Sequence, residues 1–347
     1  ACGRVSGRGR RCRQSHGVSV SEQPARLAVR SVDDLVGLVP YLMGFHPRES
    51  LVAMVLEEGR LHVTARVDLA IAGHPDELEG LLGRLFARFP AAEVWFLAYT
   101  EDEERGWAAL DACAQLVGLV RLGRLIQVGG KGWRADCPEG PWGEISGAVS
   151  ATAAEASVLG LAPLTSRERL ADAVAGPPDG EVGDLLAAFE ATDAELAALG
   201  ARGRNRLLRN LLRTPAVCRV KDCVRLALLV HRPECQLAVL RSLGKATAEQ
   251  QLGLWRQVVR HSLVSHRPTV LGLLGMAAWQ TGDGALQVVC LEELDRIDPA
   301  VPLAAVLEWL NRNVVPPGDW DELRGMLLGS LAEWLRPADP PTSRRGR

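Results

Sequence analysis

Apolar residues recur at two different spacings along this chain, and the spacing changes near the middle. Up to about residue 160, strand-like apolar runs alternate with segments whose apolar residues lie three or four positions apart. After the turn-forming run Gly176-Pro177-Pro178-Asp179-Gly180, only the helical spacing continues. We therefore predict an α+β or α/β N-terminal domain with a mixed sheet, followed by an all-α C-terminal domain.

The N-terminal pattern is specific enough to place individual elements. Ser31, with Asp34 three residues later, resembles a capping box that opens a helix, and Pro40, Gly44 and Pro47 are expected to break that helix into a turn-rich loop. Two β-hairpins are predicted, one from residues 50–56 and 60–69, the other from residues 121–128 and 133–136. The other predicted elements are strands at 26–30 and 93–100 and helices at 74–89, 104–120 and 151–159.

The C-terminal pattern predicts helices of roughly 12 to 16 residues with short connections, which is typical of a helical bundle or of a helical-repeat protein. One window favours tetratricopeptide-like repeats. Leu274-Gly275, Gly282 and Pro299 fall at the offsets of one such repeat, although Gln287 stands where a small residue is expected.

Composition shifts give the domain boundaries. Residues 1–25 are predicted to be a disordered basic tail, 26–175 the α/β domain, 176–181 a linker, 182–336 the helical domain, and 337–347 a disordered Pro- and Arg-rich tail. The chain has 347 residues, more than one hydrophobic core usually holds, so two domains are the natural expectation.

Charge and cysteine usage exclude several classes of protein. The net charge of −2 argues against a general nucleic-acid or membrane coat, and no apolar run reaches the roughly 18 residues of a membrane span. No secretory signal pattern is present. The eight cysteines form no C-x-x-C pair, so neither a metal site nor a cofactor is predicted. The expected location is the cytoplasm.

The stretch Val39-Pro40-Tyr41-Leu42-Met43-Gly44-Phe45-His46-Pro47-Arg48-Glu49-Ser50-Leu51-Val52 resembles the signature of an actinobacterial family catalogued as domain of unknown function 4192. Further similar elements follow in the same order over most of residues 26–335: Thr64-Ala65-Arg66-Val67-Asp68-Leu69, Gly132-Trp133-Arg134, Cys137-Pro138, Ser166-Arg167-Glu168 and Val220-Lys221-Asp222. The resemblance implies no particular activity.

Two groups of residues in the N-terminal half could carry chemistry. His46, Glu49 and Ser50 lie in the loop before a predicted strand, where a His could act as a base, a Glu could orient it, and a Ser could be a nucleophile or phosphate ligand. Arg66 and Asp68 lie one residue apart on a strand and so share a face, where they could line a pocket. The alternative for both groups is structural: hydrogen bonds that hold the loop and an ion pair. No phosphate-binding or dinucleotide-binding motif is present.

The helical half carries a basic stripe. Arg202, Arg206, Arg209 and Arg213 are spaced 4, 3 and 4 residues apart, which places them on one side of a helix that presents leucines on the other side. Such a stripe could contact phosphates or an acidic partner. It could also be a solvated face, or pair with acids of the preceding helix such as Glu195. No aromatic residue interleaves the arginines, so base stacking is not indicated.

Three functional hypotheses follow. The first is a non-enzymatic protein that binds another macromolecule, most simply a protein, through the helical half. The second is an enzyme or small-ligand binder that uses the loop at residues 40–50. The third, more weakly supported, is nucleic-acid binding through the arginine stripe. No membrane association is expected.

Overall fold

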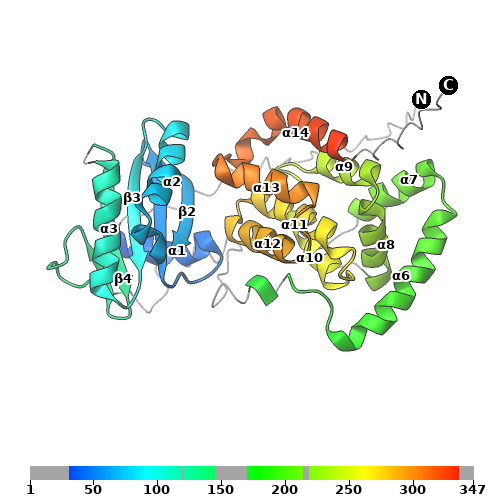
Figure 1. The fold of residues 1–347 in the computed structure, drawn as a ribbon, viewed down its shortest axis with the longest axis horizontal. Coiled ribbons are helices and arrows are strands. Elements are labelled where there is room, and N and C mark those ends of the chain that lie inside the picture. Colours follow the sequence, from blue (N-terminus) through cyan, green and yellow to red (C-terminus); the bar gives the residue numbers. More distant parts are fainter. Residues whose placement is uncertain (1–30, 119, 145–169, 173, 214–218, 336–347) are drawn as a thin grey trace, which may run out of the picture.

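The chain forms an N-terminal half built on a β-sheet and a C-terminal half made of helices (Figure 1). The structure is a computed structural model that describes residues 31–118, 120–144, 170–172, 174–213 and 219–335. The described strands are β1 (Ser50–Glu57), β2 (Arg60–Asp68), β3 (Glu93–Tyr99), β4 (Leu122–Gly129) and β5 (Gly132–Ala135). The longer helices of the N-terminal half are α1 (Val32–Met43), α2 (Pro75–Arg88) and α3 (Glu103–Val117).

Nine longer helices are described in the C-terminal half: α6 (Val182–Ala197), α7 (Ala201–Leu212), α8 (Val220–Val230), α9 (Pro233–Ser242), α10 (Ala248–Arg260), α11 (Arg267–Thr281), α12 (Gly284–Ile297), α13 (Pro302–Arg312) and α14 (Trp320–Trp334). Short 3-10 helices are η1 (Leu69–Gly73), η2 (Asp179–Glu181) and η3 (Pro317–Asp319). This arrangement confirms the predicted fold class. No helix of the described residues is both long and apolar enough to cross a bilayer.

The sheet is mixed, with strand order β2-β1-β3-β4-β5. β1 pairs antiparallel with both β2 and β3, β3 pairs parallel with β4, and β4 pairs antiparallel with β5. The parallel pair is joined through α3, because parallel neighbours need a crossover connection rather than a hairpin. The parallel pairing therefore brings the carboxyl ends of β3 and β4 to one edge of the sheet.

Both faces of the central strands are buried. On one face, β1 and β3 share a cluster with Leu82 of α2 and Leu110 of α3. On the other face, Val52 and Leu97 share a cluster with Val39 of α1, and this cluster continues through the helical half. Alternate residues of a strand point to opposite faces, so strands that are apolar at nearly every position need cover on both sides.

The predicted hairpins are both confirmed, and the first has a turn that its sequence explains. Glu57 pairs with Arg60, so the loop consists of Glu58 and Gly59 alone. Both loop residues have positive φ, 51° and 70°, as the common two-residue hairpin turn of type I′ requires. Gly59 adopts this conformation without steric cost. The turn sets the pairing of Glu57 with Arg60, and a shift between Val55 and Leu56 sets the register of the rest of the hairpin.

Helix α1 begins as predicted but ends later. The Ser31 hydroxyl accepts a hydrogen bond from the Asp34 backbone nitrogen at 3.0 Å. The predicted break at Pro40 is wrong, because the helix passes through Pro40 and ends at Gly44 in the left-handed conformation, φ 74°. Pro40 and Met43 are both buried. Burial of this last turn offsets the backbone hydrogen bond that a proline removes.

The predicted helices at 74–89 and 104–120 and the strand at 93–100 are confirmed by α2, α3 and β3. The predicted strand at 26–30 and helix at 151–159 lie outside the described residues. Between the halves, residues 175–178 have no regular secondary structure. The proposed domain limits remain predictions.

The helical half is organised around α11. Twelve of the fifteen residues of this helix are buried, and α8, α10, α12 and α13 all pack against it. A linear repeat array stacks each unit only on its neighbours, whereas α11 is surrounded. The window with Leu274-Gly275 and Gly282 does form a helix–turn–helix, with Gly282 at φ 82°, but tetratricopeptide-like repeats are not confirmed.

Glycines let α11 approach α13 closely. A Cβ atom at Gly272 would lie 2.6 Å from the Cβ of Leu303, and one at Gly275 would lie 2.7 Å from Leu307 Cδ1. These separations are shorter than carbon atoms tolerate, so an added methyl group would force the two helices apart.

We therefore expect Gly272→Ala to lower the free energy of unfolding by about 1–3 kcal/mol, the usual cost of overpacking a core. Gly253→Ala in α10 is the matched control, since a Cβ there meets nothing within 4 Å. That control should raise stability by roughly 0.5–1 kcal/mol through helix propensity. Urea unfolding followed by circular dichroism measures both changes. A Gly272→Ala protein as stable as the control would contradict the close packing.

Candidate functional site

The loop at residues 44–49, which contains the candidates His46 and Glu49, meets the carboxyl end of β3. β1 runs antiparallel to β3 and Ser50 lies opposite Tyr99, so the residues just before β1 adjoin those just after β3. Because β4 is parallel to β3, its carboxyl end lies at the same edge. Ligands of open α/β sheets tend to bind at such edges.

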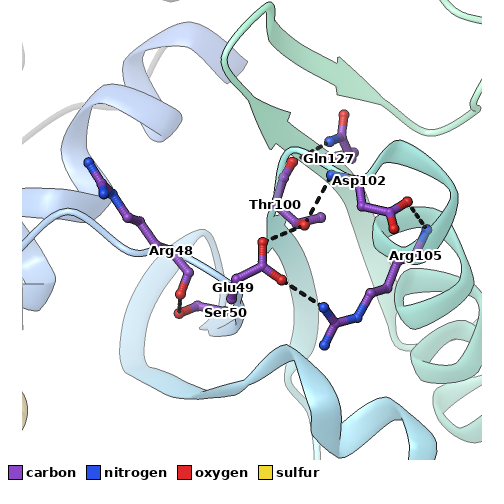
Figure 2. Close-up of polar contacts among 7 residues, drawn as sticks. All are labelled: Arg48, Glu49, Ser50, Thr100, Asp102, Arg105 and Gln127. Carbon is purple, nitrogen blue, oxygen red and sulfur yellow. Dashed lines mark hydrogen bonds and ion pairs between the residues drawn. The ribbon is translucent and has the colours of Figure 1, made fainter.

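Glu49 links this loop to the start of α3. Its Oε1 accepts a hydrogen bond of 2.7 Å from the Thr100 hydroxyl, and its Oε2 forms a 2.9 Å ion pair with Arg105 Nη1. The Thr100 hydroxyl also accepts from the Asp102 backbone nitrogen, and the Asp102 carboxylate caps α3 by accepting from the Arg105 backbone nitrogen. Figure 2 shows the Glu49 carboxylate between Thr100 and Arg105.

Glu49 adopts a backbone conformation that L-residues avoid, with φ 42°. The left-handed region costs roughly 1–2 kcal/mol for a residue with a side chain. The two contacts to Thr100 and Arg105 hold it there. Both partners are more than 50 positions away in the chain, so tertiary contacts stabilise the strained loop.

Hydrogen bonds hold the carboxyl end of β4 at the same edge. Gln127, fully buried, donates from Nε2 to the Thr100 carbonyl at 3.0 Å, and the Gly130 backbone nitrogen donates to Glu101 Oε2 at 2.9 Å. A Cβ at Gly129 would lie 2.9 Å from the Thr100 carbonyl oxygen. Gly129, the last residue of β4, therefore allows the two strand ends to pack closely.

Ser50, Arg66 and Asp68 form a separate chain of contacts across the first hairpin. The Ser50 hydroxyl is buried, donates to the Arg48 carbonyl at 2.6 Å and accepts from Arg66 Nε at 2.9 Å. Arg66 Nη2 pairs with Asp68 Oδ1 at 2.5 Å. Ser50 thus gives its proton to a backbone carbonyl, whereas a nucleophile would have to give it to a base.

His46 joins neither network. Its side chain is exposed and makes no hydrogen bond with the described part of the chain. The five N-terminal candidates are thus divided among two networks and one isolated side chain. Among the described residues, no group of three or more His, Cys, Asp or Glu could hold a metal ion.

A third polar cluster lies beside the carboxyl edge. Glu103 pairs with Lys131 at 2.9 Å and with Arg134 at 3.3 Å, and Arg134 stacks over the Trp142 ring at 4.3 Å. The hydrogen bond from Lys131 lowers the pKa of Glu103 below its usual value. Thr100, Arg105 and Gln127 were not singled out from the sequence. The antiparallel pairing of β1 with β3 brings Thr100 and Arg105 to Glu49, and the parallel pairing of β3 with β4 brings Gln127 to Thr100.

The four predicted binding arginines share one exposed face of the helical half. Arg202, Arg206 and Arg209 lie on α7 and Arg213 follows its last residue. We call these four residues the arginine face; all four side chains are exposed. Leu208 and Leu211, on the other side of α7, are buried. The spacing therefore predicted this face correctly.

The arginine face has no acidic partner within the described structure, and no ion pair there involves any of its four residues. Glu195 of α6, an expected partner, pairs instead with Lys221 at 3.2 Å and Arg225 at 2.6 Å. Those two contacts lower the pKa of Glu195, with the Arg225 hydrogen bond as the larger cause. Arg204, off the face, donates to the Leu199 carbonyl at the end of α6.

For the hairpin network, we expect Ser50→Ala to lower the free energy of unfolding by about 1–3 kcal/mol, because it leaves the Arg48 carbonyl and Arg66 Nε without their buried partner. Ser330→Ala, on the exposed surface of α14, is the control and should change stability by less than about 0.5 kcal/mol. Thermal and urea unfolding measure both. Equal stability of the two variants would show that the Ser50 hydroxyl has no structural role.

Comparison with known proteins agrees with the resemblance in the sequence. No curated protein and no solved structure matches the chain. The model of the family described as domain of unknown function (DUF4192) matches residues 33–318, from the start of α1 to η3. The match spans both halves and most of the chain, and this protein therefore belongs to that family.

Proposed function

We propose that this protein acts by binding another protein through its helical half, and that the arginine face contacts an acidic surface of that partner. The observation that carries the proposal is the arginine face itself: four exposed arginines on and just after α7, none of which forms an ion pair with an acid among the described residues. An isolated array of like charges repels itself, and an acidic partner would relieve this repulsion. Arginine is also enriched in protein interfaces.

A protein partner fits the surface better than a nucleic acid does. The arginine face extends over eleven residue steps, about 16 Å of helix, so it offers few phosphate contacts. No aromatic side chain lies among the arginines for bases to stack on. The net charge of the whole chain is −2, which gives no long-range attraction for a polyanion.

The proposed meeting place is the cytoplasm. None of the five cysteines of the described residues forms a disulfide bond there, and four of them, Cys113, Cys223, Cys235 and Cys290, are buried. Free buried cysteines are compatible with a reducing compartment. Catalysis at the loop before β1 has less support, because the Ser50 hydroxyl is already used in the hairpin network.

The arginine face can be tested with a charge-matched pair of double variants. Arg206→Ala/Arg209→Ala removes two charges from the face, and Arg241→Ala/Arg260→Ala removes two exposed charges from α9 and α10. We expect the first pair to weaken binding to the partner at least about tenfold, and the control to have little effect. Both should unfold within about 0.5 kcal/mol of the unaltered protein.

The measurement is cross-linking and affinity capture from the native host with mass spectrometry, followed by titration of the captured partner against each variant. Equal affinity for both double variants would remove the arginine face from the interface. Binding of random-sequence DNA or RNA would instead favour a nucleic-acid partner. In that case the slope of log affinity against log salt concentration should correspond to about two fewer phosphate contacts in Arg206→Ala/Arg209→Ala.

A further inference from the structure

A cavity of about 470 Å³ runs along the open edge of the sheet, between the two halves of the molecule. Residues 61–67 of edge strand β2, which lies on the side of the sheet facing the helical half (Figure 1), all line it. Met43 of α1 and Leu85 of α2, which pack on opposite faces of the sheet, line it too. A space that contacts both faces must pass around the edge, so it adjoins the backbone of β2 as well as its side chains.

The backbone of β2 presents unpaired donors and acceptors to this space. The Leu69 nitrogen donates to the Glu49 carbonyl at 2.9 Å, so these two residues form a hydrogen-bonded pair of the antiparallel hairpin. Such pairs alternate with pairs whose backbone groups point away from the partner strand. By the observed register, Ala65 bonds to β1, whereas the N–H and C=O groups of Thr64 and Arg66 point to the open edge. In the described part of the chain, these four groups have no backbone hydrogen-bond partner.

Helices form the wall opposite this edge. α11, α12, α13 and the loop after α13 contribute mostly apolar lining, including Ala285, Val288 and Leu310. The indole nitrogen of Trp279, another lining residue, donates to the Val315 carbonyl at 2.9 Å and holds the loop against α11. A single extended chain can enter between this wall and β2. The β2 edge of a second copy cannot, because it would bring its own helical wall with it.

The charges around the cavity favour an uncharged occupant. Among the described residues that line it, Arg66 is the only Asp, Glu, Lys or Arg, and it is paired with Asp68 at 2.5 Å. A charged side chain would lose its hydration here without gaining a counter-charge. Both ends of this chain are rich in arginine, with seven in residues 1–30 and four in residues 336–347. An uncharged segment of another protein therefore matches the cavity better than either end of this chain does.

We propose that this cavity binds an extended, uncharged segment of another protein, which adds as a strand to the open edge of β2. The backbone of the segment pairs with the outward N–H and C=O groups of Thr64 and Arg66, as in other complexes that form by strand addition. Its alternate side chains point to opposite faces of the sheet and contact the apolar residues of α1 and α2. This site is separate from the arginine face, so each proposal can fail without the other.

The test selects a phage-displayed library of random nonapeptides against the full chain. We expect uncharged peptides rich in apolar residues to be enriched. Thr64→Pro should weaken the binding of an enriched peptide at least about tenfold, because it removes an outward N–H group and obstructs the edge without removing a hydrogen bond to β1. Thr64→Val, the matched control, keeps the N–H group and should bind as the unaltered protein does.

A second pair of variants covers the case in which Thr64→Pro fails to fold. Ala285→Trp places a large ring in the cavity from the helical wall and should abolish binding. Ala187→Trp, on the exposed surface of α6, is its control and should leave binding unchanged. An enriched peptide with every amide nitrogen methylated should not bind, because it has no N–H group to donate to β2.

Hydrogen exchange of single amides, followed by NMR on the full chain, reports on the edge directly. In the free chain, the amide protons of Thr64 and Arg66 should exchange faster than those of Val63 and Ala65, which are bonded to β1. An enriched peptide should slow the exchange of Thr64 and Arg66 at least about tenfold and leave Val63 and Ala65 unchanged.

Several results would overturn the proposal. One is the enrichment of no peptide, and another is equal binding of an enriched peptide by Thr64→Pro or by Ala285→Trp. Slow exchange of Thr64 and Arg66 without any peptide would show that the edge is already covered. If that protection were lost on dilution, the occupant would be a second copy of the chain. If it did not change with concentration, the occupant would be a segment of the same chain.

Discussion

The central strands β1 and β3 are apolar on both faces, and the rest of the structure depends on covering them. α2 and α3 cover one face, while α1 covers the other and joins a core that continues into the helical half. Burial of this apolar surface is the main favourable term in folding. It also joins the two halves, because Val39 of α1 and the buried residues of α11 belong to one continuous cluster.

The cover is incomplete along β2, the edge strand. Its residues from Val63 to Val67 are only half-buried. A cavity lies between this strand and helices α11–α13. Gln287 of α12 lies in the opposite wall of this space. Cores are normally packed to crystal-like density, whereas the junction of the two halves leaves a cavity of about 470 Å³.

Polar groups on two surfaces of this molecule differ in whether they pair within the chain. At the carboxyl edge of β3 and β4, hydrogen bonds and an ion pair link Glu49, Thr100, Arg105 and Gln127, and the contacts of Glu49 hold its strained backbone. Within the part of the chain that the structure describes, the arginine face forms no ion pair. Hydrogen bonds made within the chain stabilise its fold, whereas charges left without partners remain available for another molecule. This contrast, rather than the number of charges, distinguishes the two surfaces.

Local features of this protein were determined by the sequence itself. The Ser31 cap, the Glu58-Gly59 turn and the arginine spacing of α7 depend on residues within about three helical turns of each other, where backbone geometry leaves few alternatives. Tertiary structure alone decided the remainder. Because of tertiary contacts, α1 continues through Pro40 and β3 pairs parallel with β4. Such contacts also bring Glu49 to Thr100 and place Gln287 in the wall of a cavity. Each of these outcomes depends on contacts between distant segments, whose burial and hydrogen bonding outweigh the local preferences that a pattern of residues records.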